Sequence, residues 1–409
     1  MTMTINNEHK KLNFSSEREQ SQACLNSAEH EKNQGRKVLN VPNLRFKEFQ
    51  GEWKELGLSE LLDFKNGLNP KPNKFGKGIK FISVMDILNN AVITYDCIKA
   101  SVDVTEKELS DFSVEKGDIL FQRSSETLED VGRANVYMDD KTSVFGGFVI
   151  RGKKKGEYDP QYFNYLLRSP FARKRIIPMG AGAQHFNIGQ EGLSKVKLHF
   201  ANIEEQKKIG NFLSLLDERI ATQNKIIDKL QSLIKGIRNK LFENDKDWRK
   251  AKIREFLCIG NGKDYKHLDF GDIPVYGTGG KMLSVNDFLY DGDSVCIGRK
   301  GTIDTPLFLT GKFWTVDTLF YTYGFKDVLP KFCYYLFKQI NWQLYNEGTG
   351  VPSLSKSTIE NIKVRIPSIV QQYKICYILD SYEDKIKNEG LILDLYCSQK
   401  QYLLRQMFV

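Results

Sequence analysis

The stretch that decides the fold runs from Ile203 to Phe242 and reads IEEQKKIGNFLSLLDERIATQNKIIDKLQSLIKGIRNKLF. Its apolar residues recur in alternating steps of four and three, with one interruption at Gln223. This is the heptad spacing of a helix that packs along a partner helix. A helix of roughly forty residues would be about 60 Å long at 1.5 Å per residue, so we expect it to act as a spacer. The apolar residues are Ile209, Leu213, Leu216, Ile220, Ile227, Leu230, Ile234, Ile237 and Leu241.

A second stretch, from Ile369 to Phe408, repeats the pattern and supplies a partner within the same chain. Ile375 stands 166 positions after Ile209, and the same offset carries Gln223 onto Glu389. We therefore expect a paired helical stalk, with two ordinary core helices as the alternative. The polar pair could be a register-setting layer, a partner-facing site or a tolerated polar position. The other matched residues of the second stretch are Leu379, Tyr382, Ile386, Leu393, Leu403 and Met407.

The rest of the chain is also duplicated. Trp53 to Gly67 is echoed by Trp248 to Gly262, and the pair Gly117-Asp118 by Gly292-Asp293. Short β-type runs such as FISVMDI and AVITYDCI precede one strongly helical run, DPQYFNYLLRSPFARKRI. The chain thus reads as globular domain, helix, globular domain, helix. The predicted boundaries are a flexible N-terminal extension (1–40), a first globular domain (41–202), a central helix (203–245), a second globular domain (246–367) and a C-terminal helix (368–409).

Composition favours an anionic partner. The 409 residues hold 60 Lys and Arg against 51 Asp and Glu, a net charge of +9. A solvated basic surface is the alternative. The seven scattered cysteines form no CxxC pair, which suits a reducing cytosol and argues against a disulfide framework or a zinc cluster. The sequence shows neither an apolar run of the ~20 residues that span a bilayer nor a signal peptide, so we expect a cytoplasmic protein without membrane contact.

Catalytic signatures are absent from the sequence. It has no GxxxxGK[ST] phosphate loop, and Asn69-Pro70-Lys71-Pro72 only superficially resembles the tetrad that holds a flipped base in amino-methylating enzymes. Glu52-Trp53-Lys54 resembles the end of a nuclease motif, but no suitable Pro-Asp precedes it. We therefore expect a chain that binds no cofactor or metal and performs no bond chemistry.

Basic and amide side chains in predicted loops are the candidates for DNA binding. Arg reads guanine and Gln or Asn reads adenine, while Lys and Ser hold phosphates. For each of them a solvated loop residue is the alternative. The best candidates follow the matching Gly-Asp strands or precede the closing helix of each domain. The full set is Lys71, Lys74, Gln122, Arg123, Ser124, Lys153, Lys154, Arg173, Gln184, His185, Lys263, Lys266, Arg299, Lys300, Thr349 and Ser353.

These features resemble the specificity subunit of type I restriction-modification systems. The resemblance covers nearly everything after residue 41 and rests on VPNLRFKEFQGEWKE, the repeated IEEQKKIGNFLSLLDERI block and GTGVPSLSKSTIENIKVRIPSIVQQ. It implies two mixed α/β target recognition domains separated by two long helices packed as an antiparallel coiled coil, with a pseudo-twofold internal repeat. The N-terminal extension is longer than the resemblance implies.

The resemblance also implies function and partners. Each recognition domain would read one half of a split, asymmetric site in double-stranded DNA. Two modification subunits would methylate adenine with S-adenosylmethionine, and two restriction subunits would add ATP- and Mg-dependent translocation and cleavage. Lysines on the outer helix faces, such as Lys207, Lys208 and Lys225, would meet modification subunits or simply be solvated.

Two other functions stay open at this stage. One is a non-catalytic coiled-coil adaptor that carries two protein-binding domains. The other is an enzyme whose motif is unfamiliar. Steep salt dependence of DNA binding would separate the first from a DNA-recognition subunit, because phosphate contacts release counterions.

Overall fold

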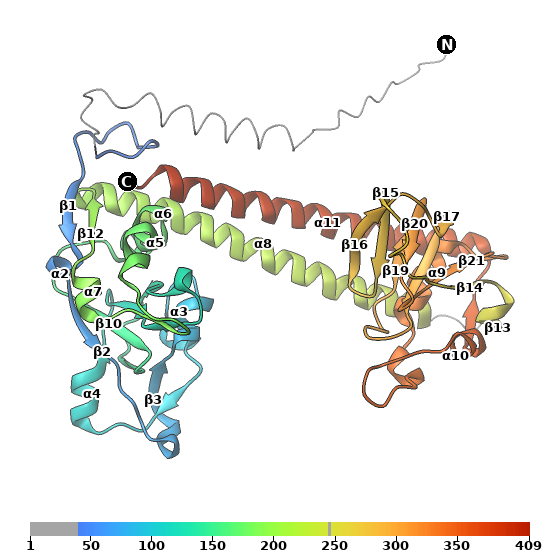
Figure 1. Ribbon diagram of the computed structural model, residues 1–409, viewed down its shortest axis with the longest axis horizontal. Helices are drawn as coiled ribbons and strands as arrows, with labels where there is room; N and C mark the ends of the chain where they lie inside the picture. The colour runs from blue at the N-terminus through green and yellow to red at the C-terminus, as the bar shows by residue number, and fades with distance from the viewer. Residues whose placement is uncertain (1–39, 244–246) are drawn as a thin grey trace, which may run out of the picture. The chain divides into compact units, whose positions relative to one another are not determined.

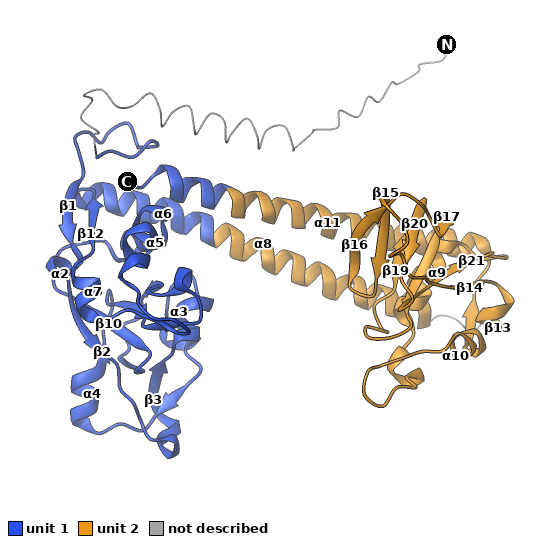
Figure 2. Ribbon diagram, viewed as in Figure 1, with its two compact units in different colours: residues 1–217, 399–409 blue, residues 218–398 orange. Residues whose placement is uncertain are grey.

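The computed structural model describes residues 40–243 and 247–409. The chain divides into two compact units (Figure 2): one holds the residues up to Asp217 together with Gln399–Val409, and the other holds Glu218–Ser398. Both boundaries fall inside long helices, so each of these helices contributes to both units. The predicted flexible extension lies outside the described residues, except for Asn40.

Two four-stranded sheets build the first unit (Figure 1). One is antiparallel with the order β2-β10-β6-β8, and the other has the order β4-β3-β9-β5 with β3 and β9 parallel. The short pairs β1-β12 and β7-β11 complete it. The strands are β1 (Lys54–Gly57), β2 (Leu62–Asn66), β3 (Phe75–Ile82), β4 (Ser101–Val102), β5 (Ser113–Val114), β6 (Ile119–Gln122), β7 (Ser124–Ser125), β8 (Ala134–Val136), β9 (Ser143–Phe145), β10 (Val149–Lys154), β11 (Phe186–Asn187) and β12 (Lys197–Phe200).

The second unit repeats this sheet plan. The order β14-β21-β18-β19 corresponds to the first sheet, and β16-β15-β20-β17, with β15 and β20 parallel, corresponds to the second. The pair β13-β22 corresponds to β1-β12. The internal repeat read from the sequence is therefore confirmed. The strands are β13 (Arg249–Lys252), β14 (Cys258–Asn261), β15 (Phe270–Gly277), β16 (Gly280–Val285), β17 (Tyr290–Asp291), β18 (Ser294–Gly298), β19 (Leu307–Leu309), β20 (Lys312–Thr315), β21 (Leu319–Tyr323) and β22 (Lys363–Ile366).

Short helices connect and cover the sheets. In the first unit they are α2 (Leu58–Leu61), η1 (Pro72–Lys74), α3 (Val84–Asn89), η2 (Tyr95–Cys97), α4 (Glu106–Phe112), η3 (Leu128–Asp130), α5 (Pro160–Arg168), α6 (Pro170–Ile176), η4 (Ile177–Met179) and α7 (Gln190–Ser194). In the second unit they are η5 (Ile253–Glu255), α9 (Pro330–Gln339), η6 (Trp342–Tyr345) and α10 (Lys356–Asn361).

Local capping changed three of the predicted elements. The single helix expected from DPQYFNYLLRSPFARKRI is two helices, because Ser169 ends α5 and caps α6, accepting a hydrogen bond from Ala172 N. The run FISVMDI is half strand and half helix, because Ser83 donates from its main chain and its hydroxyl to Asp86 Oδ2 and so starts α3. The expected strand AVITYDCI holds the 3-10 helix η2 and one isolated bridge.

The two long helices are α8 (Ile203–Glu243, 41 residues) and α11 (Ile369–Gln406, 38 residues). In the second unit they run antiparallel. Gln223 contacts Glu389 there, and Ile234, Ile237 and Leu241 pack against the core that contains Ile375 and Leu379. The predicted intramolecular helix pair is therefore confirmed.

The last residues of the chain complete the core of the first unit. The Phe408 ring lies 6.3 Å from that of Trp53 and 5.5 Å from that of Tyr162 between centroids, and Lys400 Nζ lies 2.5 Å from Asp217 Oδ1. In the second unit the counterpart is Phe242, at the end of α8. Its ring centroid lies 5.7 Å from that of Trp248 and 5.7 Å from that of Phe332. Each unit thus closes on the end of a long helix.

A buried glutamine fixes the start of each long helix. Gln206 accepts from Asp159 N at 2.9 Å and donates to Ala201 O at 2.8 Å. Gln372, its counterpart, accepts from Leu329 N at 2.8 Å and donates to Pro367 O at 3.0 Å. Each side chain therefore ties α5 or α9 to the turn before a long helix.

Among the described residues, no helix is long and apolar enough to cross a membrane.

Candidate nucleic-acid interface

In the first unit the loop after β6 is bonded to the loop before α7. Arg123 N donates to Phe148 O at 2.9 Å, and Arg123 O accepts from Ile188 N at 2.9 Å. β7 pairs with β11 beside it, and the Ser124 hydroxyl donates to Asn187 Oδ1 at 2.5 Å. The predicted residues Arg123, Ser124, Gln184 and His185 are thus brought into one loop pair, in which Gln184 and His185 are exposed.

The second unit builds the equivalent loop pair. Lys300 forms an isolated bridge with Ser353, and Arg299 O accepts from Leu354 N at 2.8 Å. Asn346 Oδ1 accepts from Gly348 N and Ser353 N, both at 2.9 Å, which folds the loop that carries Thr349. Arg299, Lys300 and Thr349 are exposed. The loops of the second unit are therefore held in shape while their longer side chains stay available to a ligand. In the first unit Arg123 is half-buried, and its Nη1 donates to Gly147 O at 3.3 Å.

Lys263 joins the second loop pair through a shared turn. Lys263 N donates to Thr315 O at 2.8 Å, and Arg299 N donates to Thr318 O at 2.8 Å. Trp314 Nε1 also donates to Lys263 O at 2.8 Å. Lys266 is exposed further along the same loop. The turn between β20 and β21 thus positions the main chain of both basic residues.

Several other predicted residues make contacts inside the first unit. Gln122 is buried and donates to Ser124 O at 2.9 Å. Lys154 Nζ donates to Tyr158 O at 3.0 Å, and Arg173 donates to Glu129 O and Val131 O at 2.8 and 2.7 Å. Lys74 pairs with Glu108 at 3.3 Å and Lys153 with Glu115 at 3.5 Å, while Lys71 is exposed just before η1. The predicted set does not form one surface, and DNA contact stays a prediction for each member.

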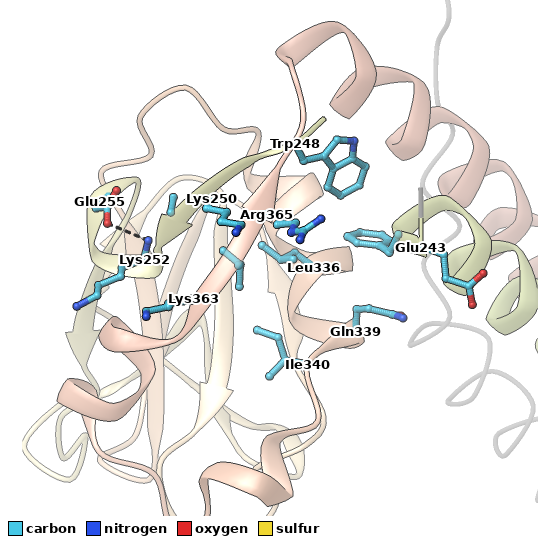
Figure 3. A pocket seen from close by; sticks show the side chains of 13 residues that line it. Glu243, Trp248, Lys250, Lys252, Glu255, Leu336, Gln339, Ile340, Lys363 and Arg365 are labelled. Carbon is cyan, nitrogen blue, oxygen red and sulfur yellow. Dashed lines mark hydrogen bonds between the residues drawn. The ribbon is translucent and has the colours of Figure 1, made fainter. Parts of the chain in front are cut away.

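The sequence reasoning missed a basic surface on β13 and β22 (Figure 3). Lys250 is directly opposite Arg365, and Lys252 is directly opposite Lys363. The four side chains line a groove of ≈ 740 Å³ together with Trp248, Leu336 and Ile340. Like charges directly opposite each other destabilise a strand pair. The alternation of basic residues in RKAK and KVRI could have revealed this basic quartet.

Apolar side chains on the outer faces of the long helices were also missed. In the second unit Ile226 and its counterpart Ile392 are 37% and 38% exposed, and Leu391 and Leu395 are 54% and 68% exposed. Contiguous exposed apolar patches mark interaction sites, and Leu391 and Leu395, four residues apart on α11, are neighbours on one helix face. By contrast, Lys207 pairs with Glu204 at 3.0 Å, and Lys208 pairs with Glu48.

No group of three or more His, Cys, Asp or Glu side chains is arranged to hold a metal ion within residues 40–243 and 247–409.

Fold and site together define a class: a duplicated protein in which two similar mixed α/β domains each carry a loop pair with an arginine and each pack on two long helices. The profile of the family described as type I restriction modification DNA specificity domain matches residues 50–232 and again 245–394. The chain belongs to this family.

Individual relatives agree with the assignment. The chain is 25% identical over 406 residues to the predicted specificity subunit of the type I restriction enzyme MjaX from Methanocaldococcus jannaschii, which covers 86% of this chain and 91% of the relative. It is 23% identical over 345 residues to the MjaVIII specificity subunit of the same organism, covering 70% and 76% of the two chains. A stretch of 145 residues is 26% identical to the EcoKI specificity subunit of Escherichia coli, covering 35% and 30%.

Solved structures share the fold. The S subunit of a type I restriction-modification system from M. genitalium superposes with a TM-score of 0.58 at 20% identity, covering 90% of this chain and 99% of the other. A chain from a structural study of the assembly of a type I system gives a TM-score of 0.58 at 12% identity, covering 86% and 96%.

Proposed function

We propose that this chain is the DNA sequence-recognition subunit of a type I restriction-modification complex and that it performs no bond chemistry itself. It binds an asymmetric, bipartite site in double-stranded DNA, one half-site per domain. The observation that carries the proposal is the loop pair repeated in both units, with Arg123 in one and Arg299 in the other, in a chain of the DNA specificity family.

The geometry of the loop pairs suits base reading. The main chain on both sides of Arg299 is fixed by bonds to Thr318 and Leu354, so little backbone entropy is lost on binding. A guanidinium held by such a fixed main chain can donate two parallel hydrogen bonds to guanine in the major groove. Lys263 and Lys300 beside it are suited to phosphates, which fix the register of the protein on the duplex.

The helix pair sets the spacing between the half-sites in this proposal. It is supported by the length and continuity of α8 and α11, each of which runs through both units. The insertion points after Lys225 and after Ile386 face each other in the antiparallel pair. Seven residues inserted at each point would preserve both apolar seams, because seven residues make one heptad. The insertion adds about 10 Å, or roughly three base-pair rises of 3.4 Å. A methylated site with an unchanged spacer would refute this role of the helices.

Modification subunits dock on the exposed apolar residues of the long helices, and restriction subunits join the complex. S-adenosylmethionine, ATP and Mg enter with these subunits. The pair Leu391→Asp and Leu395→Asp should abolish co-purification of the modification subunit, because it introduces charge into the apolar patch. Lys385→Asp, at an exposed side chain on another face of the same helix, is the control, and equal loss of the partner with both variants would contradict this docking surface.

The central test is a map of methylated adenines in cells that carry the complete system. Replacement of residues 71–200 by another recognition domain should change one half-site only, and Arg299→Gln should relax one base position in the other half-site. Lys229→Gln on the outer face of α8 removes the same charge and should leave the map unchanged. A map that is insensitive to both changes would overturn the proposed function, as would partner binding that is independent of salt and DNA.

A further inference from the structure

The first unit contains a pocket into which three arginines converge. It has a volume of ≈ 420 Å³ and lies between α3, α5, α6 and the segment that leads into β8. Arg133 comes from that segment, Arg168 from the last turn of α5 and Arg173 from α6. The remaining lining is apolar, from residues such as Ile87 and Leu167, except for Glu129.

Hydrogen bonds orient two of the guanidinium groups without neutralising them. Arg173 Nη2 donates to Glu129 O at 2.8 Å and to Val131 O at 2.7 Å, and Arg168 Nη2 donates to Asn90 O at 3.2 Å. These acceptors are main-chain carbonyls, which carry no net charge. Arg173 Nη1 is buried and has no hydrogen-bond partner among the described residues. A buried donor that is left unpaired destabilises the folded protein, so this atom points to a missing acceptor.

Two carboxylates outside the lining act on the arginines: Asp217 raises the pKa of Arg168 and Asp130 raises that of Arg173, each by less than burial lowers it. Asp217 is itself paired with Lys400 Nζ at 2.5 Å. Asp130 Oδ1 lies 2.6 Å from Arg133 Nη2 and compensates that arginine. Burial lowers the pKa of Arg168, and burial together with the positive charge of Arg133 lowers the pKa of Arg173 to about 10. Glu129 is the single acid among the residues that line the cavity. The lining therefore carries more positive than negative charge in a partly desolvated site, which an anion would stabilise.

We infer that the pocket of Arg133, Arg168 and Arg173 binds an oxyanion of the phosphate type. Guanidinium groups match phosphate oxygens with paired N–H donors, and the unpaired Arg173 Nη1 supplies one donor that is already in position. The anion is either a phosphate of the DNA backbone or a free phosphate compound. This site goes beyond the loop pairs of the proposed function and does not depend on base reading.

The second unit differs at one of the three arginine positions. Lys338 occupies the position that corresponds to Arg168, since Pro160 of α5 corresponds to Pro330 of α9. Lys338 Nζ lies 2.7 Å from Glu383 Oε1, whereas Asp217, the counterpart of Glu383, pairs with Lys400 Nζ at 2.5 Å. At this position the charge is therefore compensated directly in the second unit, which supplies an internal comparison.

The test uses the full-length chain and inorganic phosphate. We expect phosphate to raise the Tm relative to chloride at equal ionic strength, because a ligand that binds only the folded state stabilises it. The double variant Arg133→Gln, Arg168→Gln should lose this rise. Lys225→Gln with Lys229→Gln on α8 removes the same charge and should retain it. If the double variant fails to fold, Arg133→Gln alone, at an exposed side chain, gives the same comparison. No specific rise, or an equal rise in the arginine variants, would overturn the proposal.

Duplex DNA then identifies the source of the phosphate. If the pocket takes a backbone phosphate, the double variant should weaken DNA binding about equally for all sequences and reduce the salt slope by about 1. If it takes a free compound, the salt slope should stay unchanged while the response to phosphate is lost. Both results support the site and assign its ligand. If the chain binds no DNA, the proposed function is refuted. The effect of phosphate on the Tm still tests the oxyanion site, because that measurement does not require DNA.

Discussion

Gln223 on α8 donates from Nε2 to Glu389 on α11, to Oε2 at 2.6 Å and to the main-chain O at 2.9 Å. The two residues are 166 positions apart, the offset that relates the two copies of the helix. Each residue is therefore the counterpart of the other. In an antiparallel pair of repeated helices only one position can meet its own counterpart, so this contact marks the pseudo-twofold axis of the repeat. A polar pair there favours one register over others.

Replacement of Gln223 by Leu should destabilise the second unit. The change leaves the carboxylate of Glu389 without its donor in a partly buried seam, and the free energy of unfolding should fall by about 1–3 kcal/mol. The double variant Gln223→Leu, Glu389→Leu should recover most of this loss, because two apolar residues restore packing. Urea unfolding of Gln223→Leu, Glu389→Leu and the double variant measures the coupling. Additive losses would show that the pair is merely a tolerated polar position.

Phe408→Ala should destabilise the first unit although the residue lies at the C-terminus. Its ring is buried against Trp53 and Tyr162, and loss of a buried Phe costs about 3–5 kcal/mol. Hydrogen exchange should accelerate in residues 40–217 and leave residues 247–367 protected. Tyr402→Ala, at a side chain that is 59% exposed, is the control. Phe242→Ala should give the reverse pattern, and uniform acceleration in either variant would contradict the division into units.

Lys363→Glu should stabilise the pair of β13 and β22. It places a carboxylate opposite Lys252 in place of a second ammonium, and cross-strand charge pairs of this kind are worth about 0.2–1 kcal/mol. Lys363→Gln removes only the repulsion and should give a smaller gain. Urea unfolding at low salt measures both effects, and high salt should reduce them. A loss of stability at low salt would show that the basic quartet is already compensated within the chain.

The first unit should lose stability in mild acid because of His199. Burial on β12 lowers the pKa of His199, and Arg175 lowers it further. Between this lowered pKa and the unfolded value of 6.5 the unfolded chain binds more protons, so stability rises with pH through that window and is level above it. His199→Gln should therefore reduce the difference in unfolding free energy between about pH 5.5 and about pH 7.5. His185→Gln, at an exposed position, should keep that difference, and the prediction fails if both variants behave alike.

Sequence periodicity was sufficient where the physical cause is local or repeats along the chain. The seam from Ile209 to Leu241 recurs in the second stretch without a shift, and both stretches are helices that begin at Ile203 and Ile369. The loops of Arg123 and Arg299 were also recognised as candidates, because each follows a matching Gly-Asp strand. That they pair with the loops before the closing helices came from the structure. The predicted boundaries of strands and helices were wrong where a single side chain decides them, as with the caps at Ser83 and Ser169.

Individual charged side chains could not be assigned from the sequence. Arg173 was assigned to a predicted loop, but it lies on α6 and donates to the carbonyls of Glu129 and Val131. Arg133 and Arg168 were not predicted as site residues, since nothing in their local sequence shows that they share a cavity with Arg173. Burial and partner choice depend on residues that are distant along the chain.

The sequence by itself determined the duplication, the two long helices and their pairing, because heptad spacing and a constant offset are properties of order along the chain. Tertiary structure alone decided which end of which helix closes each unit, which basic residues face each other on β13 and β22, and which arginines share a pocket. The physical reason is that these features arise from packing between segments far apart in sequence. Phe408 against Trp53 leaves no local signal in the residues around it. The sequence marks Gln223 and Glu389 as interruptions of the seam, but only the structure shows that they contact each other.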